Sequence, residues 1–437
     1  MRIINRQPIY NCWLFIVLIA ASVACSKEEP SAPQVKFITP AENASFGYQS
    51  LIPIEATISS ERELKKVTVS IRDEDMITAI SGGSHDVEGN SVTFTRSVMH
   101  NNLHLETGTY YATLTVETDH DAYNYYQKVS LFEAPKKLKG LFIFTQSGAQ
   151  SLEIYRYDST LTFEDLTTKN MDFQEAAFNP RYQYLAIAGS QSGDLIALNP
   201  EFMTEEWFVP NTGNSGYDYF TSVKYDEKTK FTLVTISSRE FFAYAGSQNP
   251  RLSATTDEFD QPTKSALLEN LITLYTVDPP QGFHKLELYH KSTGTLLQSR
   301  FINMIPVFLH QKSGDTPLLF GNENGQAVIK QYQYSGDNMT TLTNIPGGEM
   351  HDAMHSGDYF YIAHDQGIYR YSHSNGGYTQ VVSGACLKVW FDNAEERIFA
   401  IMANDPAQLV VYNDSGTLIQ TIGVGSDIED VALWFNK

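Results

Sequence analysis

Short sequence elements recur at multiples of about 43 residues through positions 138–437, and this period constrains the fold more than any other feature. The tetrapeptide Ile-Tyr-Arg-Tyr stands at 154–157 and returns at 368–371, about five periods later. The segment 289–298, which contains Gly294, resembles the segment 412–420, which contains Gly416, about three periods later. An aromatic residue followed by Asn or Asp recurs at 178, 225, 391 and 435. The C-terminal part therefore consists of degenerate repeats of one structural unit.

These repeats are rich in Tyr, Phe, Val and Thr and show no helical stripe. Solenoids of this period are helical, whereas a unit of several short strands is typical of a β-propeller blade. The spacing of the first-strand positions predicts seven blades, with the poorest strand at 265–270. Residues 427–437 resemble the first strand of a blade and residues 140–144 a second strand. We therefore expect the C-terminal strand to complete the first blade and to protect its sheet edge.

Residues 35–134 predict a separate small β-sandwich. Alternating apolar and polar residues predict strands at 35–38, 52–58, 64–71, 92–97, 110–117 and 123–132. Thr39-Pro40-Ala41-Glu42-Asn43 follows the first strand, and Gly108-Thr109-Tyr110-Tyr111 opens a late one. In these features the segment resembles immunoglobulin-like (Ig-like) modules of bacterial surface proteins. A linker at 134–137 then leads to the propeller at 138–437. The predicted class is all-β.

The first 24 residues predict an export signal. Arg2 and Arg6 precede an apolar run at 13–21 that is too short to span a bilayer. Ser22 and Ala24 are small residues before Cys25. A cysteine at this cleavage point is the substrate for lipid attachment, so we expect Cys25 to be acylated and residues 25–34 to form a tether. The alternative is an ordinary secretory signal with an unrelated cysteine.

The stretch Ser26-Lys27-Glu28-Glu29 follows the predicted lipidation site. It resembles the surface-export signal of Bacteroidota lipoproteins, which implies a lipid-anchored protein on the outer membrane, facing the exterior. The alternative is a solvated tether. Together the segments resemble a Bacteroidota-type surface-exposed lipoprotein with an Ig-like module and a β-propeller of WD40-like or PQQ-like repeats.

Composition excludes some partners. The chain has 51 acidic and 31 basic residues and a net charge of −20, which argues against nucleic acid because phosphate neutralisation needs clustered Lys and Arg. Of three cysteines, only Cys386 would remain in the folded part. A disulfide within the mature chain is then impossible, and we expect Cys386 to be a small buried hydrophobic residue.

The sequence contains no phosphate loop, dinucleotide fingerprint, nucleophile elbow or calcium loop, and we predict no catalytic residue, metal or cofactor. His351 and His355 resemble a two-histidine metal motif, but their context predicts a strand. On a strand, residues four apart lie about 13 Å from each other, too far for one metal ion.

In propellers, one rim of the central channel is where ligands usually meet the fold. The segments that enter the first strands carry carboxylates and aromatic rings suited to sugars, peptides or a protein partner. The predicted rim residues are Asp172, Phe173, Tyr217, Asp218, Tyr219, Glu349, His351, Asp352, Asp427 and Glu429, with Glu175, Lys388 and Asp430 in the same segments.

The sequence therefore predicts a non-catalytic binding or scaffold module at the cell surface. The expected partner is an envelope protein complex, such as an outer-membrane transporter, or an extracellular glycan. The alternative is a propeller-fold polysaccharide lyase or hydrolase that uses His351, His355 and His364.

Overall fold

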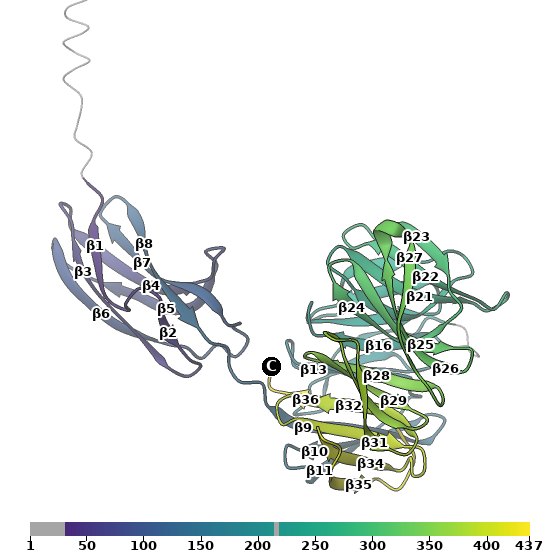
Figure 1. Cartoon of the computed structure of the whole chain (residues 1–437). Helices are drawn as coiled ribbons and strands as arrows, with labels where there is room; N and C mark the ends of the chain where they lie inside the picture. The colour runs from purple at the N-terminus through teal and green to yellow at the C-terminus, as the bar shows by residue number, and fades with distance from the viewer. Residues whose placement is uncertain (1–30, 214–217) are drawn as a thin grey trace, which may run out of the picture. The chain divides into compact units, whose positions relative to one another are not determined.

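The computed structural model describes residues 31–213 and 218–437, so Cys25 and the segment from Ser26 to Glu29 lie outside the described residues. The chain divides into two compact units, residues 1–135 and 136–437 (Figure 1). Regular structure in the described ranges is β-strand, apart from the three-residue 3₁₀ turn η1 (Tyr334–Gly336). No helix within those ranges is long and apolar enough to cross a membrane.

The first unit contains two sheets, with strand orders β1-β3-β6 and β2-β8-β7-β4-β5. The six strands expected from alternation are present, together with the short β2 and the glycine-containing β5. The strands are β1 (Gln34–Thr39), β2 (Ala44–Phe46), β3 (Leu51–Ser59), β4 (Leu64–Arg72), β5 (Thr78–Asp86), β6 (Ser91–Met99), β7 (Gly108–Thr118) and β8 (Ala122–Leu131).

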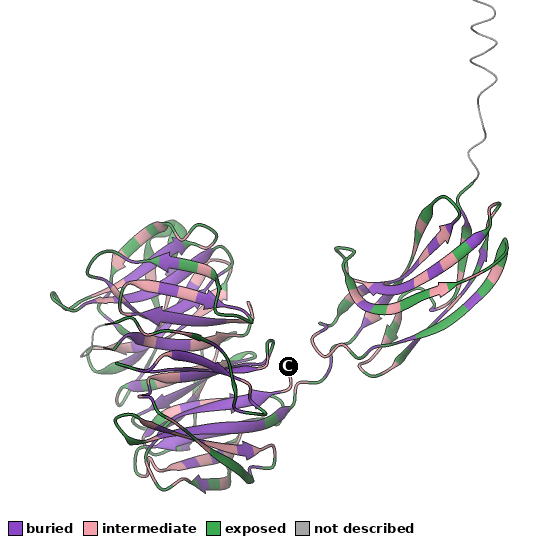
Figure 2. Ribbon diagram, turned by 180° about the vertical axis from the view of Figure 1, so that it is seen from behind, coloured by how far each residue is buried: buried purple, intermediate pink, exposed green. Residues whose placement is uncertain are grey.

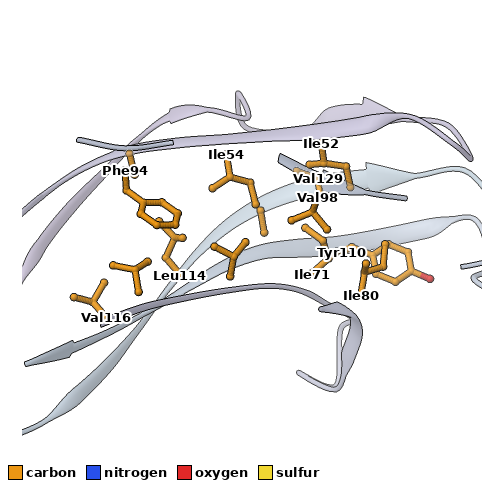
Figure 3. Packing of buried hydrophobic residues seen from close by; sticks show 14 of the residues in the cluster. Ile52, Ile54, Ile71, Ile80, Phe94, Val98, Tyr110, Leu114, Val116 and Val129 are labelled. Carbon is orange, nitrogen blue, oxygen red and sulfur yellow. The ribbon is translucent and has the colours of Figure 1, made fainter. Parts of the chain in front are cut away.

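Period-two alternation builds the core of this unit. On β3, Ile52, Ile54, Ala56 and Ile58 are fully buried, whereas the residues that alternate with them are exposed or half-buried. Figure 3 shows Ile52, Ile54 and Phe94 facing Leu114 and other apolar side chains from the opposite sheet. The unit therefore has its own hydrophobic core, as two packed sheets require.

The second unit contains seven four-stranded antiparallel sheets among the described residues. From the innermost strand of each sheet outward, the strands are β36 (Ile428–Phe435), β9 (Leu138–Gly148), β10 (Ser151–Asp158) and β11 (Phe163–Lys169); β12 (Glu175–Asn179), β13 (Tyr184–Ala188), β14 (Leu195–Leu198) and β15 (Glu205–Val209); β16 (Phe220–Asp226), β17 (Phe231–Ile236), β18 (Glu240–Tyr244) and β19 (Pro250–Thr255); β20 (Gln261–Leu267), β21 (Leu271–Asp278), β22 (Phe283–His290) and β23 (Leu296–Phe301); β24 (Ile305–Ser313), β25 (Thr316–Glu323), β26 (Gln326–Gln333) and β27 (Asn338–Ile345); β28 (Met350–Ser356), β29 (Tyr359–His364), β30 (Gly367–Ser372) and β31 (Tyr378–Ser383); β32 (Cys386–Asp392), β33 (Arg397–Met402), β34 (Gln408–Asn413) and β35 (Leu418–Gly423).

The innermost strands form a closed ring. Each of β12, β16, β20, β24 and β28 contacts the next innermost strand, β32 contacts β36, and β36 contacts β12. This arrangement of radial sheets is a β-propeller. The predicted closure is confirmed, because β36 pairs antiparallel with β9 and the yellow C-terminal strand lies beside the blue β9 in Figure 1.

Burial is high in the second strand of the sheets and low in the outermost strand. All five residues of β13 and all six of β33 are buried, whereas the outermost β11 is largely exposed (Figure 2). Neighbouring sheets cover both faces of the second strands, so these strands are continuous apolar runs rather than alternating ones. This burial explains why period-two patterns are weak in the repeats.

The repeated segments occupy equivalent places. The two Ile-Tyr-Arg-Tyr tetrapeptides lie on β10 and β30, each the third strand of its sheet. Gly294 and Gly416 have positive φ angles of 64° and 84° in the hairpins before β23 and β35. A Cβ atom on either would collide with a backbone carbonyl oxygen of the preceding sheet, that of Ser253 or Val381. Glycine recurs because the backbone conformation and the close approach exclude a side chain.

One strand differs from expectation. The fourth first strand, expected at 265–270, is shifted toward the N-terminus, because β20 ends at Leu267. Trp207 on the outermost strand β15 is buried and packs against Tyr184 and Tyr244. Trp390 lies two residues after the shift of pairing register in its strand, and Trp434 lies four residues after its own, so the two do not occupy equivalent positions.

Candidate functional site

A cavity of about 900 Å³ lies inside the ring, and all seven innermost strands contribute to its lining. We call it the central cavity. Its size is within the range of small-molecule sites, which are few per protein and usually concave. The central cavity is therefore the strongest candidate site among the described residues.

A recurrent β-bulge occurs at side chains that line the cavity. In six innermost strands the pairing register shifts by one residue near the start of the strand. A bulge redirects the side chain that follows it. We call the residue after the shift the ring position. The ring positions are Ser222, Lys264, Phe308, Asp352, Lys388 and Asp430, and Glu175 takes the corresponding place on β12.

Three ring-position carboxylates join neighbouring sheets. The Asp430 carboxylate accepts a hydrogen bond from the backbone N–H of Ala176 at 2.9 Å, and Glu175 accepts one from Val223 at 2.7 Å. Asp352 accepts one from Val389 at 3.1 Å. In each pair the donor lies on the next innermost strand. These bonds satisfy strand edges that would otherwise lack partners.

The lysines of the cavity have different surroundings. The Lys388 ammonium lies 3.8 Å from the Asp430 carboxylate and donates to the backbone carbonyl of Glu429. The Lys224 ammonium donates to the carbonyl of Leu309 at 2.8 Å and lies 3.8 Å from the ring centroid of Phe308. Lys264 is half-buried, and none of the described residues accepts a hydrogen bond from it or forms an ion pair with it.

Burial shifts the pKa values of several groups in the cavity, and it moves two of them toward neutral pH. Burial raises the pKa of the Asp352 carboxyl to about 6, against hydrogen bonds from Val389 and charges on Lys388 and Lys264 that lower it. Burial also lowers the pKa of the Lys224 ammonium to about 8. Both groups therefore titrate closer to neutral pH than ordinary Asp and Lys side chains, which makes them able to exchange protons there.

The histidines separate into two groups. His351 and His355 both lie on strand β28, as predicted, and both line the cavity. His355 stacks on His310 with ring centroids 4.0 Å apart, while His351 bonds to the Asp365 carboxylate at 2.8 Å. His364 is fully buried on β29, contacts the carbonyl of Gly348 at 3.2 Å and is not part of the lining.

The other predicted rim residues mostly organise loops. The Asp172 carboxylate accepts hydrogen bonds from the backbone N–H groups of residues 190–193 at 2.8–2.9 Å, which lowers its pKa although burial opposes this. Asp218 accepts one from the Ser190 hydroxyl at 2.6 Å. Phe173 and Tyr219 are buried, and Tyr217 lies outside the described residues.

The last three predicted rim residues, Glu349, Asp427 and Glu429, are exposed and lie outside the cavity lining. Glu349 donates its backbone N–H to Asp365 at 2.8 Å, and Asp427 and Glu429 are exposed just before and on β36. Of the predicted rim residues, His351 and Asp352 line the central cavity, together with Glu175, Lys388 and Asp430 from the same segments.

Four further lining residues are not indicated by the sequence, because they lie in the interior of innermost strands: Lys224, Lys264, Phe308 and His310. Two of the strands that carry these residues, β20 and β24, contain no aromatic residue followed by Asn or Asp. Aligning the repeats at the bulge instead would have placed Lys264 and Phe308 in the same column as Asp352 and Asp430.

A cluster of three acidic residues outside the central cavity has the composition of a cation site. Oxygens of Asp257, Asp260 and Glu287 lie within 4.8 Å of one another. The Lys285 ammonium already binds both oxygens of Asp260, at 2.7 and 2.8 Å, and the Tyr289 hydroxyl donates to Glu287 at 2.6 Å. These partners neutralise part of the charge without a metal ion.

No protein-family model and no curated protein matches this chain. A protein of unknown function from Desulfotomaculum acetoxidans is similar in structure, with 13% identity over 68% of this chain and 99% of that chain and a TM-score of 0.50. A quinoprotein alcohol dehydrogenase-like protein from Bacteroides thetaiotaomicron has 12% identity over 92% and 99%, with a TM-score of 0.46. The β-propeller domain of Cps50 from Myceliophteria thermophila has 11% identity over 60% and 89%, with a TM-score of 0.46. At such identities a likeness concerns the fold alone, and the topology of this chain is that of a β-propeller protein.

Proposed function

We propose that this chain is a lipid-anchored surface protein with a non-catalytic binding role, and that its ligand occupies the central cavity. The single observation that carries the proposal is the cavity of about 900 Å³, to which every innermost strand contributes. In this proposal the ligand, part of an extracellular glycan or of an envelope protein, reaches the cavity through the rim.

The propeller is proposed to have seven blades, one for each four-stranded sheet. The first unit is proposed to be an Ig-like spacer. Its strand order supports this, as does the Tyr110 hydroxyl at the start of β7, which donates to the carbonyl of Glu106 at 2.8 Å. A tyrosine that bonds back to the backbone a few residues upstream is a hallmark of Ig-like sandwiches.

Acylation of Cys25 and surface export through Lys27, Glu28 and Glu29 complete the proposal. In this arrangement the lipid holds the chain at the outer membrane, the sandwich serves as a spacer, and the propeller presents a rigid cavity to the exterior. The charge of −20 fits a soluble extracellular domain that is repelled by anionic surfaces.

A second candidate is a polysaccharide lyase or hydrolase. The observation that favours it is the presence of Asp352 and Lys224, with pKa values of about 6 and about 8, in one cavity. His351 and His355 also line the cavity, whereas His364 does not. The binding role is preferred because Asp352 already accepts two backbone hydrogen bonds and Lys224 already donates to a carbonyl.

The test uses the full-length protein in detergent with panels of polysaccharides and envelope peptides. Gln174, half-buried at the cavity, is replaced by Trp to narrow it, and Gln174→Trp should weaken binding about tenfold, as loss of roughly 1.4 kcal/mol implies. The matched control is Gln191→Trp at an exposed loop, which should bind like the wild type. Equal binding by all three proteins, or no binding at all, would refute the cavity as the ligand site. New reducing ends or unsaturated sugars would favour the enzyme.

A further inference from the structure

The charge of the central cavity differs from that of the chain as a whole. The chain has 51 acidic and 31 basic residues, whereas the described lining has six lysines and five acidic residues. The lining therefore has a formal excess of one positive charge, opposite in sign to the net charge of the chain.

All five acidic residues of the lining already have donors. Glu175, Asp352 and Asp430 accept backbone N–H groups of the neighbouring innermost strands. Asp226 accepts from the backbone N–H of Thr229 at 2.9 Å, and Glu227 pairs with Lys136 at 3.0 Å. Each of these carboxylates therefore already has a partner within the propeller.

The lysines retain donor capacity. An ammonium group has three N–H donors. Lys224, Lys228 and Lys312 each donate to one oxygen of an uncharged group, at 2.8, 2.8 and 2.6 Å. Lys264 has no hydrogen-bond or ion-pair partner in the described parts of the chain. Its charge interacts with Asp352 and repels Lys224. Lys224 is also attracted by Asp226, Glu175 and Asp352, so both lysines belong to one electrostatic cluster that includes these carboxylates.

The lysines with unused N–H donors lie on one side of the ring. The adjacent strands β16, β20 and β24 carry Ser222, Lys264 and Phe308 at the ring position, whereas β28, β36 and β12 carry carboxylates there. An anion at Lys264 would therefore approach the cluster from a side without a ring-position carboxylate and would relieve its repulsion with Lys224. The Phe308 ring next to Lys224 offers an apolar surface for the uncharged part of the same ligand.

We propose that the central cavity selects a small organic anion, with its carboxylate or phosphate group bound by Lys264 and Lys224 and its uncharged body packed toward Phe308. The inference rests on the proposed role of the cavity as the ligand site. Charge-assisted hydrogen bonds are worth more than neutral ones, so loss of the Lys264 ammonium should weaken binding about tenfold to a hundredfold.

The probes are citrate, inorganic phosphate and D-galacturonate, each compared with chloride at equal ionic strength, with D-galactose as the uncharged twin of galacturonate. The readout is the melting temperature of the propeller in the full-length chain as a function of probe concentration, because a ligand that binds the folded state raises it. A comparison of citrate with phosphate shows whether the cavity prefers a carboxylate or a phosphate group. A comparison of galacturonate with galactose shows whether the anion can be part of a sugar.

We expect at least one anion to stabilise the wild type and Lys264→Arg, and to stabilise Lys264→Gln only at concentrations about tenfold higher or more. Lys36→Gln, which removes the same charge from an exposed strand of the first unit, should behave like the wild type. The inference is overturned if none of the three anions distinguishes Lys264→Gln from the wild type. A polysaccharide or peptide that binds Lys264→Gln and wild type equally overturns this inference and leaves the proposed function standing. If an anion stabilises the protein in a way that depends on Lys264, but no polysaccharide or envelope peptide binds, this inference stands and the proposed function is overturned.

Discussion

The carboxylate of Asp430 on β36 accepts a hydrogen bond from the backbone N–H of Ala176 on β12 at 2.9 Å, across 254 positions of sequence. Asp430 is 5% exposed and also accepts the N–H of Val431 at 2.9 Å. The same residue therefore joins the C-terminal strand to the neighbouring sheet and lines the central cavity.

Replacement of Asp430 by Ala should destabilise the propeller by about 1–3 kcal/mol, because it leaves a buried backbone N–H without an acceptor. Asp430→Asn retains one acceptor oxygen, so its free energy of unfolding should fall by less than that of Asp430→Ala. Urea denaturation measures the free energy of unfolding. Asp427→Ala, at an exposed position just before the same strand, is the control and should remain within about 0.5 kcal/mol of the wild type. Equal losses in the two Ala variants would mean that the bond to Ala176 contributes nothing.

Truncation after Ser426 should unfold the propeller. It removes β36, the innermost strand paired with β9, including Trp434 and Phe435, which are both buried. Burial of each ring contributes about 1.5–3 kcal/mol, so the loss approaches the net stability of a domain. The first unit has its own core and should survive as a protease-resistant fragment of about a hundred residues. A truncated chain that melts at the temperature of the wild type would contradict this.

Gly416→Ala should be more destabilising than an ordinary glycine replacement. A positive φ of 84° costs an alanine about 1–2 kcal/mol, and its Cβ would also collide with the carbonyl oxygen of Val381. Gly423→Ala in the neighbouring strand β35 is the control, since no atom lies within 4 Å of its added Cβ. Thermal unfolding compares the two variants. A melting temperature that is equally unaffected in both would show that the hairpin adjusts freely.

Asp352 should make the propeller less stable as the pH rises from about 4 to 7. Its pKa is raised from 3.8 to about 6 in the folded chain, so the folded state favours the protonated form, and this contribution is lost as the pH rises through 6. Asp352→Asn cannot ionise and should therefore gain stability relative to the wild type over that range. The gain should be less than about 3 kcal/mol, because two pKa units set the upper limit and partial exposure reduces it.

The measurement is the free energy of unfolding of both proteins at several pH values. Asp358→Asn, at an exposed turn that follows β28, is the control for removal of one carboxylate. Parallel curves for the wild type and Asp352→Asn would show that Asp352 has no raised pKa.

Cys25→Ala should release the protein from the membrane fraction, because the acylated side chain is the proposed anchor. The matched variant replaces Lys27, Glu28 and Glu29 by Ala and keeps Cys25. It should remain lipidated but face the periplasm, so that protease added to whole cells no longer cleaves it. Membrane association of Cys25→Ala would refute the lipid anchor. Equal cleavage of the matched variant and the wild type would mean that Lys27, Glu28 and Glu29 act only as a tether and not as an export signal.

The repeat period, the all-β class and the closure by the C-terminal strand follow from the sequence alone. Each depends on local chemistry that is repeated in the chain. Gly294 and Gly416 recur because each takes a left-handed conformation in the hairpin between the third and fourth strands of its sheet. Apolar runs such as β33 recur because the same strand is covered on both faces. Buried Cys386 also follows from its apolar neighbours.

The tertiary structure alone decided which charges meet. Lys224, Lys264 and Asp352 are far apart in sequence, and each sits in a strand whose local pattern only indicates burial. Their convergence depends on the closed ring and on a bulge that changes the direction of a side chain by one position, which the repeat period does not reveal. The sequence therefore determined the repeated unit and its closure, whereas the position of the bulge on each innermost strand decided which charges meet at the centre of the ring.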